Sequence, residues 1–175
     1  MKWIGISGGW RKTNQEIEYK IREVVQKIIQ CGDGIVSGGA LGVDYIATNE
    51  ALKFDSKANM IKVFLPTMLK KYSEHYRKHA NLGTITKEQA ENLIKQLTQL
   101  KKINPKALIE NSDINFTEET KKIMYYERNS KVVDFSDELI AFHIKTKESE
   151  GAGTEDTIEK ANKKGIPVKV FDFVI

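Results

Sequence analysis

The sequence predicts an α/β fold of the Rossmann-like type, with about five mainly parallel strands, helices on both faces of the sheet, and a helical insertion. Three observations predict it. Short apolar runs that are typical of buried strands lead directly into glycine-rich turns. Amphipathic helical patterns follow those turns, and the order strand, glycine turn, helix, strand occurs near both ends of the chain. The 175 residues suffice for one sizeable core, so we expect a single domain over residues 1–175.

The first third of the chain alternates short apolar runs with helical patterns. Apolar residues recur at spacings of three and four from Ile17 to Ile29, and Gly32 ends this helix because glycine accepts the left-handed conformation beyond a helix end. The elements expected here, in order, are a strand at 2–6, a helix at 17–29, a strand at 34–36, a helix at 43–51 and a strand at 61–65.

Residues 69 to about 120 differ from the rest and predict the helical insertion. Thr86 and Gln89 are spaced as a capping box for its second helix. Residues 69–106 carry nine Lys and Arg against three Asp and Glu, a net +6, which leaves 19 minus 21, or −2, for the remainder of a chain whose net charge is +4. Two interpretations stay open: a solvated basic face, or nucleic-acid contact in which bases stack on Tyr72, His75, Tyr76 and His79.

The last third repeats the alternation of the first. Thr117 is a good N-cap residue for a helix that runs through Tyr125 towards Val132. Gly165 ends the final helix. After the helix that starts at Thr117, the expected elements are a strand at 138–143, a glycine turn at 151–154, a helix at 156–164 and a strand at 168–171.

Three glycine turns follow predicted strands and would meet at the carboxyl edge of the sheet, where ligands bind in such folds. Glycines let the backbone approach an anion closely, and the helix that follows each turn presents free N–H groups. Ser7, Ser37 and Thr154 would add hydroxyl donors. No turn has the Walker spacing or a clean GxGxxG, which disfavours an ATPase or a dinucleotide dehydrogenase. Each turn taken alone is also compatible with a tight connection that binds nothing.

Residues 37–44, Ser-Gly-Gly-Ala-Leu-Gly-Val-Asp, resemble the SG-x-A-x-G-[IV]-D turn of the DNA-processing protein A (Smf) family. Arg128-Asn129, followed by Ser136-Asp137, is similar to the RN…SD segment of that family, and residues 151–170 resemble its final glycine turn, helix and strand. The family belongs to the Rossmann-like SLOG superfamily, which also holds the Lonely Guy phosphoribohydrolases. The resemblance covers residues 1–66 and 125–172.

The resemblance implies non-catalytic binding of a phosphate-bearing ligand, with single-stranded DNA favoured, in a DNA-processing or recombination role, and it implies a homo-oligomer. Asp44 would brace the second glycine turn through backbone N–H groups, or simply favour the positive end of a helix. Trp10 and Arg11 would stack on a base and neutralise a phosphate, or Trp10 would pack on a helix. The expected phosphate- or nucleotide-binding residues are Ser7, Gly8, Gly9, Trp10, Arg11, Ser37, Gly38, Gly39, Ala40, Gly42, Asp44, Arg128, Asn129, Gly151, Gly153 and Thr154.

Two other functions stay open. A phosphoribohydrolase or N-glycosidase needs a carboxylate, for which Glu127 and Glu155 are the candidates, although the hydrolase motif would require a glutamate where Thr157 stands. The protein could instead sense or sequester a nucleotide-derived signal, with the insertion as a lid. We expect no cofactor and no metal, because the single cysteine and the pair His75 and His79 lack further ligands. Without a long apolar stretch, a soluble cytoplasmic protein away from membranes is expected.

Overall fold

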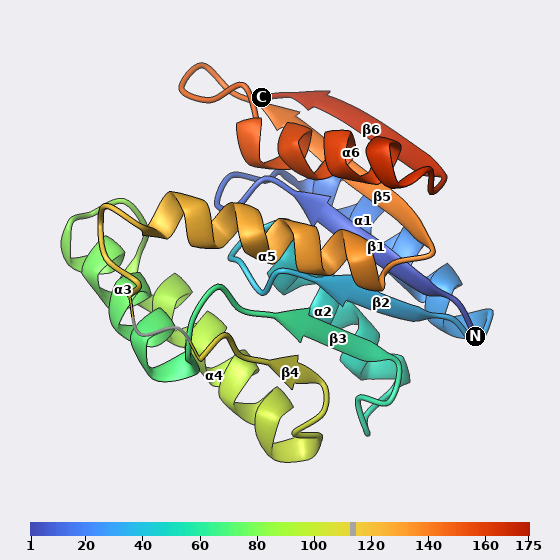
Figure 1. The fold of residues 1–175 in the computed structure, drawn as a ribbon, viewed down its shortest axis with the longest axis horizontal. Helices are drawn as coiled ribbons and strands as arrows, with labels where there is room; N and C mark the ends of the chain where they lie inside the picture. The colour runs from blue at the N-terminus through green and yellow to red at the C-terminus, as the bar shows by residue number, and fades with distance from the viewer. Residues whose placement is uncertain (113–114) are drawn as a thin grey trace.

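A sheet of six parallel strands forms the centre of the computed structural model, which describes residues 1–112 and 115–175. The strand order is β4-β3-β2-β1-β5-β6 (Figure 1). This confirms the α/β, Rossmann-like prediction, with one strand more than expected, because β4 has only two residues and leaves no sequence pattern. The strands are β1 (Trp3–Gly8), β2 (Gly34–Ser37), β3 (Ile61–Phe64), β4 (Leu108–Ile109), β5 (Glu138–Lys145) and β6 (Val168–Val174).

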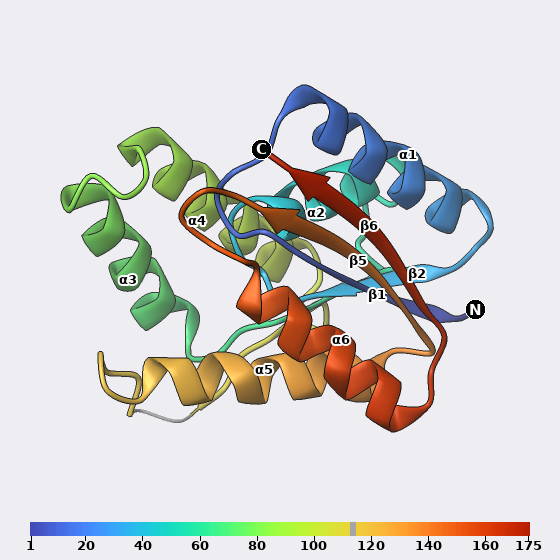
Figure 2. The same ribbon diagram turned by 90° about the horizontal axis from the view of Figure 1, so that it is seen from above.

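Helices cover both faces of the sheet, as predicted. Figure 2 shows α1 and α2 on one face and α5 and α6 on the other. Ile17, Ile21, Val25 and Ile29 of α1 form the buried stripe that their spacing predicts. The helices are α1 (Gln15–Gln30), α2 (Val43–Phe54), α3 (Leu69–Asn81), α4 (Lys87–Ile103), α5 (Lys121–Phe135) and α6 (Ala152–Lys164).

The expected insertion, residues 69 to about 120, lies between β3 and α5, and its helices α3 and α4 pack into the main core rather than standing apart from it. The capping box of α4 is present, with Thr86 and Gln89 bonded reciprocally. The segment is not purely helical, because β4 adds an edge strand to the sheet. Its residues 113–114 lie outside the described part of the chain.

Several element boundaries differ from the predictions. The helix expected to start at Thr117 starts at Lys121, and the Thr117 hydroxyl instead accepts the Thr120 amide in the preceding turn. α6 begins at Ala152, four residues early, because Gly151 adopts a left-handed conformation and the glycine turn becomes the first helical turn. Within the described ranges, no helix is long and apolar enough to cross a membrane.

The order of the strands places a crevice at the carboxyl end of β1. β1 pairs with β2 on one side and with β5 on the other, so the chain departs in opposite directions from its two neighbours. Such a switch point is where ligands bind in open parallel sheets. The predicted glycine turns follow β1, β2 and β5 at this edge.

Candidate functional site

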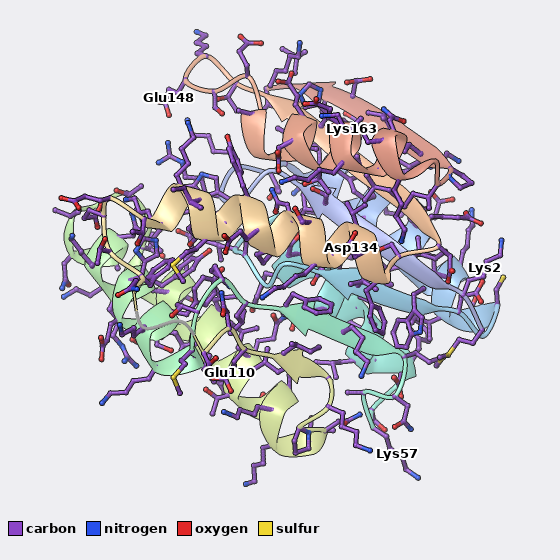
Figure 3. All side chains as sticks on the ribbon, in the orientation of Figure 1. Lys2, Lys57, Glu110, Asp134, Glu148 and Lys163 are labelled. Carbon is purple, nitrogen blue, oxygen red and sulfur yellow. The ribbon has the colours of Figure 1, made fainter. Side chains whose placement is uncertain are left out.

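A cavity of about 550 Å³ opens at the carboxyl ends of β1 and β5, a size typical of small-molecule sites. Its walls come from the three glycine turns, from α3 and α5, and from the loop between β5 and α6. In Figure 3, Glu148 marks this loop and Lys2 marks the opposite end of the molecule.

Most of the predicted site residues meet at this cavity, although they come from four separate parts of the chain. Those in the lining are Ser7, Gly8, Gly9, Trp10, Arg11, Gly38, Ala40, Asp44, Arg128, Asn129, Gly151, Gly153 and Thr154. Ser37, Gly39 and Gly42 lie outside the lining, in the buried body of the second turn. The candidate hydrolytic carboxylates Glu127 and Glu155 also lie outside it, and both are exposed.

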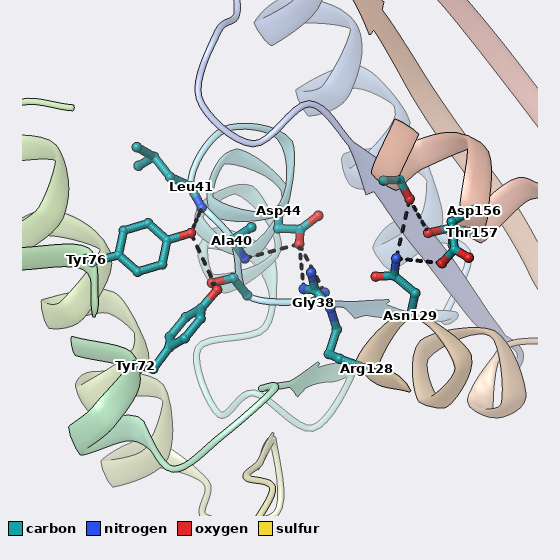
Figure 4. A network of polar contacts seen from close by, with 12 residues as sticks. Gly38, Ala40, Leu41, Asp44, Tyr72, Tyr76, Arg128, Asn129, Asp156 and Thr157 are labelled. Atoms are coloured by element: carbon teal, nitrogen blue, oxygen red, sulfur yellow. Dashed lines mark hydrogen bonds and ion pairs between the residues drawn. The ribbon is translucent and has the colours of Figure 1, made fainter. Parts of the chain in front are cut away.

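The second glycine turn is braced by Asp44, as expected. Its Oδ2 accepts the backbone N–H groups of Gly38 and Ala40, both at 3.1 Å (Figure 4). Asp44 is buried in the first turn of α2, where the positive end of the helix favours a carboxylate. These two hydrogen bonds hold the turn in its observed shape without the help of a ligand.

Two tyrosines of α3 hold the same turn from the other side. The Tyr72 hydroxyl donates to the Gly39 carbonyl and the Tyr76 hydroxyl accepts the Leu41 amide, each at 3.1 Å (Figure 4). Both side chains are almost completely buried. Of the two interpretations left open for the insertion, base stacking is wrong for these two rings, because α3 buries both of them.

Arg128 of α5 is the most unusual residue of the cavity. Its side chain is buried, its Cζ lies 5.4 Å from the Tyr125 ring centre, and Nη1 is 3.7 Å from Asp44 Oδ2, beyond hydrogen-bond range. Among the described residues, Nε and Nη1 have no hydrogen-bond partner. The guanidinium fits only because residue 38 is glycine, since a Cβ there would lie 1.4 Å from Nη1. A buried cation with unused donors beside a cavity is suited to an anionic ligand.

Burial raises the pKa of the Asp44 carboxyl, while Arg128 and the two backbone donors act to lower it.

The charged side chains that line the cavity are mostly basic. Asp44 is the only carboxylate in the described lining, against the cations Arg11, Lys12, Lys121, Lys122 and Arg128. None of the nine Lys and Arg residues of 69–106 belongs to this lining, so the positive charge of the cavity comes from outside the basic insertion.

Asn129 holds the third glycine turn in place. Its Nδ2 donates to Asp156 Oδ2 at 3.0 Å and to the Gly153 carbonyl at 3.4 Å. The Thr157 hydroxyl donates to the same carbonyl at 3.0 Å. Through these bonds the Asn129 side chain of α5 holds the first turns of α6 in place. A Cβ at Gly153 would meet nothing within 4 Å, so the turn leaves open space for a ligand.

Sequence reasoning missed His143, which supports this turn from β5. The buried ring contacts the Glu150 carbonyl through Nε2 at 2.9 Å and Asp172 Oδ1 through Nδ1 at 3.0 Å. A Cβ on Gly151 would lie 2.8 Å from the ring, and the φ of Gly151 is +84°. The one sequence signal for His143 is its position as a polar residue in a strand pattern that is otherwise mostly apolar.

Sequence reasoning also missed a carboxylate that contacts two cations of the cavity. Glu148 Oε2 lies 2.9 Å from Lys12 Nζ and 3.2 Å from Arg11 Nη2. These cations, the hydrogen-bonded Lys12 first, lower the pKa of Glu148. The residue is well exposed on the loop between β5 and α6, so nothing in the local sequence distinguishes it from a solvated surface glutamate.

His75 and His79 form a neutral pair on the α3 side of the cavity. Their Nε2 atoms are 3.1 Å apart, so one ring donates a hydrogen bond to the other. Burial, together with His79 and Lys121, lowers the pKa of His75 to about 4, and burial also lowers the pKa of His79. In the described parts of the chain, no three potential metal ligands come together.

The folded protein is expected to lose stability as the pH falls from about 6.5, the ordinary histidine value, towards 4. In this range His75 is protonated in the unfolded chain but stays neutral in the folded protein. Lys78 and Lys121 oppose protonation of His75, while Glu118, whose pKa is lowered to about 2, stays ionised. Thermal unfolding measured against pH should show a smaller decline for His75→Gln than for the wild type. An equal decline in both proteins would contradict the assignment.

Comparison with known proteins gives a match over nearly the whole chain. The family model for DNA recombination-mediator protein A matches residues 2–173. No curated protein sequence matches.

Solved structures share the fold at low identity. DNA processing protein A from Helicobacter pylori, described with a single-stranded DNA binding mode, is similar with a TM-score of 0.63 and 20% identity, over 97% of this chain and 64% of that one. The DNA processing protein A of Streptococcus pneumoniae is similar with a TM-score of 0.59 and 16% identity, over 97% of this chain and 50% of that one. A molybdenum cofactor binding protein from Rippkaea orientalis is similar with a TM-score of 0.58 and 18% identity, over 98% of this chain and 76% of that one. The chain thus spans less than two thirds of either DNA processing protein.

Proposed function

Because the chain belongs to the DNA recombination-mediator protein A family, we propose that it binds single-stranded DNA in a DNA-processing or recombination role, without catalysis. The observation that carries the proposal is the buried Arg128, whose Nε and Nη1 donors have no partner within the described chain. The binding mode named for the Helicobacter pylori relative points to the same ligand.

The chemistry of the cavity supports an anionic, phosphate-bearing ligand. The N–H groups of Gly38, Ala40 and Leu41 are used inside the protein, but α6 directs its positive end to the cavity beside the third glycine turn. Arg128 would supply paired donors to a phosphate, while the flexible lysines of α5 would act as point charges. The remaining expected contacts, among them Ser7, Thr154 and Gly153, stay predictions.

Binding of a labelled single strand, measured by fluorescence anisotropy against salt concentration, tests the proposal. If all five cations of the lining meet phosphates, log K should fall with log salt with a slope of about −3.5. Double-stranded DNA of the same length serves as the comparison. An absence of binding to single strands at low salt, with tight binding of a mononucleotide, would replace this proposal with a nucleotide sensor or carrier.

Glycosidic cleavage gains no support from the geometry. Glu127 and Glu155 lie outside the cavity lining, and Asp44 is engaged with the backbone of the second turn. Release of free base from nucleoside monophosphates would be the result that revives this function. The homo-oligomer and the cytoplasmic location remain predictions, and light scattering checks the first.

Replacing Glu148 by glutamine is expected to tighten binding of single-stranded DNA by about 2- to 5-fold at low salt. The carboxylate pairs with Arg11 and Lys12, and an incoming phosphate must compete with it for them. Glu150→Gln is the matched control, since Glu150 stands on the same loop and pairs with Lys145 instead. Equal effects of the two substitutions would show that only the net charge of the protein matters.

A further inference from the structure

The third glycine turn presents free backbone donors to the cavity. Residues 151–154 line the cavity, and the amides of Ala152 and Gly153 have no hydrogen-bond partner among the described residues. Three amides of the second turn are instead used inside the protein. The direction of the Ala152 and Gly153 amides therefore affects how well the cavity receives an anion.

His143 of β5 lies directly behind this turn. The ring is buried, and its Nε2 is 2.9 Å from the carbonyl oxygen of Glu150, the residue before the turn. Gly151 follows with φ +84°, and a Cβ there would lie 2.8 Å from the ring. The Gly151 carbonyl accepts the amides of Thr154 and Glu155, which begins α6. One side chain thus holds the point from which α6 and its free amides start.

The polar groups that face the ring are hydrogen-bond acceptors. Nδ1 lies 3.0 Å from Oδ1 of Asp172, which pairs with His143 across β5 and β6, and Nε2 also lies 3.4 Å from Glu155 Oε1. The Glu150 carboxylate points to Lys145 of β5, at 3.7 Å. Because a carbonyl and an ionised carboxylate only accept, the ring donates to both Glu150 and Asp172 when it carries two protons. With one proton it keeps only one of these hydrogen bonds.

We infer that His143 is a positioning residue of the proposed site: its Nε2–H holds the Glu150 carbonyl and thereby sets the direction of the free amides of α6. The inference rests on the proposed function, because those amides are expected to meet a phosphate. It adds that a side chain outside the cavity lining controls the affinity. It also adds a pH dependence, since the ring joins Glu150 to Asp172 only while it carries two protons, a state that histidine ordinarily loses between about pH 5 and 8.

Two substitutions that keep different donors test the assignment. In His143→Gln the amide nitrogen stands near the place of Nε2 and reaches the Glu150 carbonyl, whereas in His143→Asn it stands near the place of Nδ1. His143→Asn is expected to weaken binding of a single strand by about 5-fold or more, and His143→Gln by less than about 2-fold, because only the first leaves a buried carbonyl without its donor. Equal weakening in the two folded variants overturns the assignment.

The pH dependence is tested with Asp172→Asn, which changes a side chain that is 71% exposed. Wild-type affinity for the single strand is expected to fall by about 2- to 5-fold from about pH 6 to 8, and less in Asp172→Asn and His143→Gln. The lowered pKa values of His75 and His79 keep these rings mostly neutral over this range. Asp134→Asn is the matched control, an exposed position of α5 outside the cavity, and should keep the wild-type fall. An equal fall in all four proteins overturns the pH dependence.

A measurement without ligand separates the positioning role from the proposed function. If no strand binds, DNA binding fails, and amide hydrogen exchange at residues 151–155 then decides. Faster exchange in His143→Asn than in His143→Gln supports the positioning role, and equal exchange overturns it. If His143→Asn does not fold, the comparison of the wild type with His143→Gln and Asp172→Asn decides: a smaller fall of affinity with pH in both variants supports the role, and an equal fall overturns it.

Discussion

Replacing Arg128 by methionine is expected to weaken binding of single-stranded DNA by about 30-fold or more, the usual loss when one partner of a buried, hydrogen-bonded charge pair is removed. Arg128 is the cation of the cavity that lies buried, against Gly38 and beside Asp44. Without it, the phosphate meets an unbalanced Asp44 carboxylate in place of a positive charge. The exposed lysines of the cavity cannot replace it, because water screens them.

The controls for Arg128→Met separate binding from folding. Lys131→Ala removes one positive charge from an exposed position of the same helix outside the cavity and should change affinity less than about 2-fold. Arg128→Lys keeps the charge but not the planar guanidinium, so it should bind less tightly than the wild type and more tightly than Arg128→Met. Circular dichroism and urea unfolding establish that each variant is folded. Wild-type affinity in a folded Arg128→Met protein would remove the central support for the proposed site.

Replacing Gly42 by alanine is expected to destabilise the fold by about 3 kcal/mol or more. Gly42 has φ +84°, and a Cβ would lie 2.3 Å from the Gly9 carbonyl oxygen. That oxygen accepts the Val43 amide at 3.1 Å, which ties the first glycine turn to the start of α2. The substitution therefore strains one residue and pushes two turns of the site apart.

Two other glycines provide the comparison for Gly42→Ala in urea unfolding. Gly83 has φ +75° but open space around its Cβ position, so Gly83→Ala should cost only the conformational strain, about 1 kcal/mol. Gly153→Ala meets neither condition and should leave stability within about 0.5 kcal/mol of the wild type. A Gly42→Ala protein as stable as Gly83→Ala would show that the two turns can separate freely.

The glycine turns were identifiable in the sequence because their placement is a local pattern, whereas Asp44 and Arg128 were singled out by the resemblance of their motifs to a known family. Each turn follows an apolar run, and Asp44 stands two residues beyond Gly42, where its side chain reaches back over the turn. The same locality explains the confirmed capping box of α4. It also explains the missed strand β4, whose pairing with β3 depends on a distant partner rather than on its own two residues.

The remaining side chains of the site had no local signal. Lys121 and Tyr125 lie one helical turn apart on the side of α5 that carries Arg128, but only the packing of α5 across the strand ends turns this side to the cavity. His143 and Glu148 depend on the loop that returns from β5 over the first turn. Contacts between segments so far apart in the chain cannot be predicted from hydrophobic periodicity, because periodicity describes only neighbouring residues.

The sequence by itself determined the class of fold and the edge of the sheet at which the glycine turns meet, and it predicted that these turns bind an anion. These properties follow from hydrophobic periodicity and glycine placement, which act over a few residues. Only the tertiary structure decided that, within the described residues, the basic insertion contributes no Lys or Arg to the cavity and Arg128 Nε and Nη1 have no hydrogen-bond partner, and that Tyr72 and Tyr76 are buried while Trp10 is not. The physical reason is that burial and hydrogen-bond satisfaction depend on which distant elements pack together, and the core stripe of α3 turned its tyrosines inward.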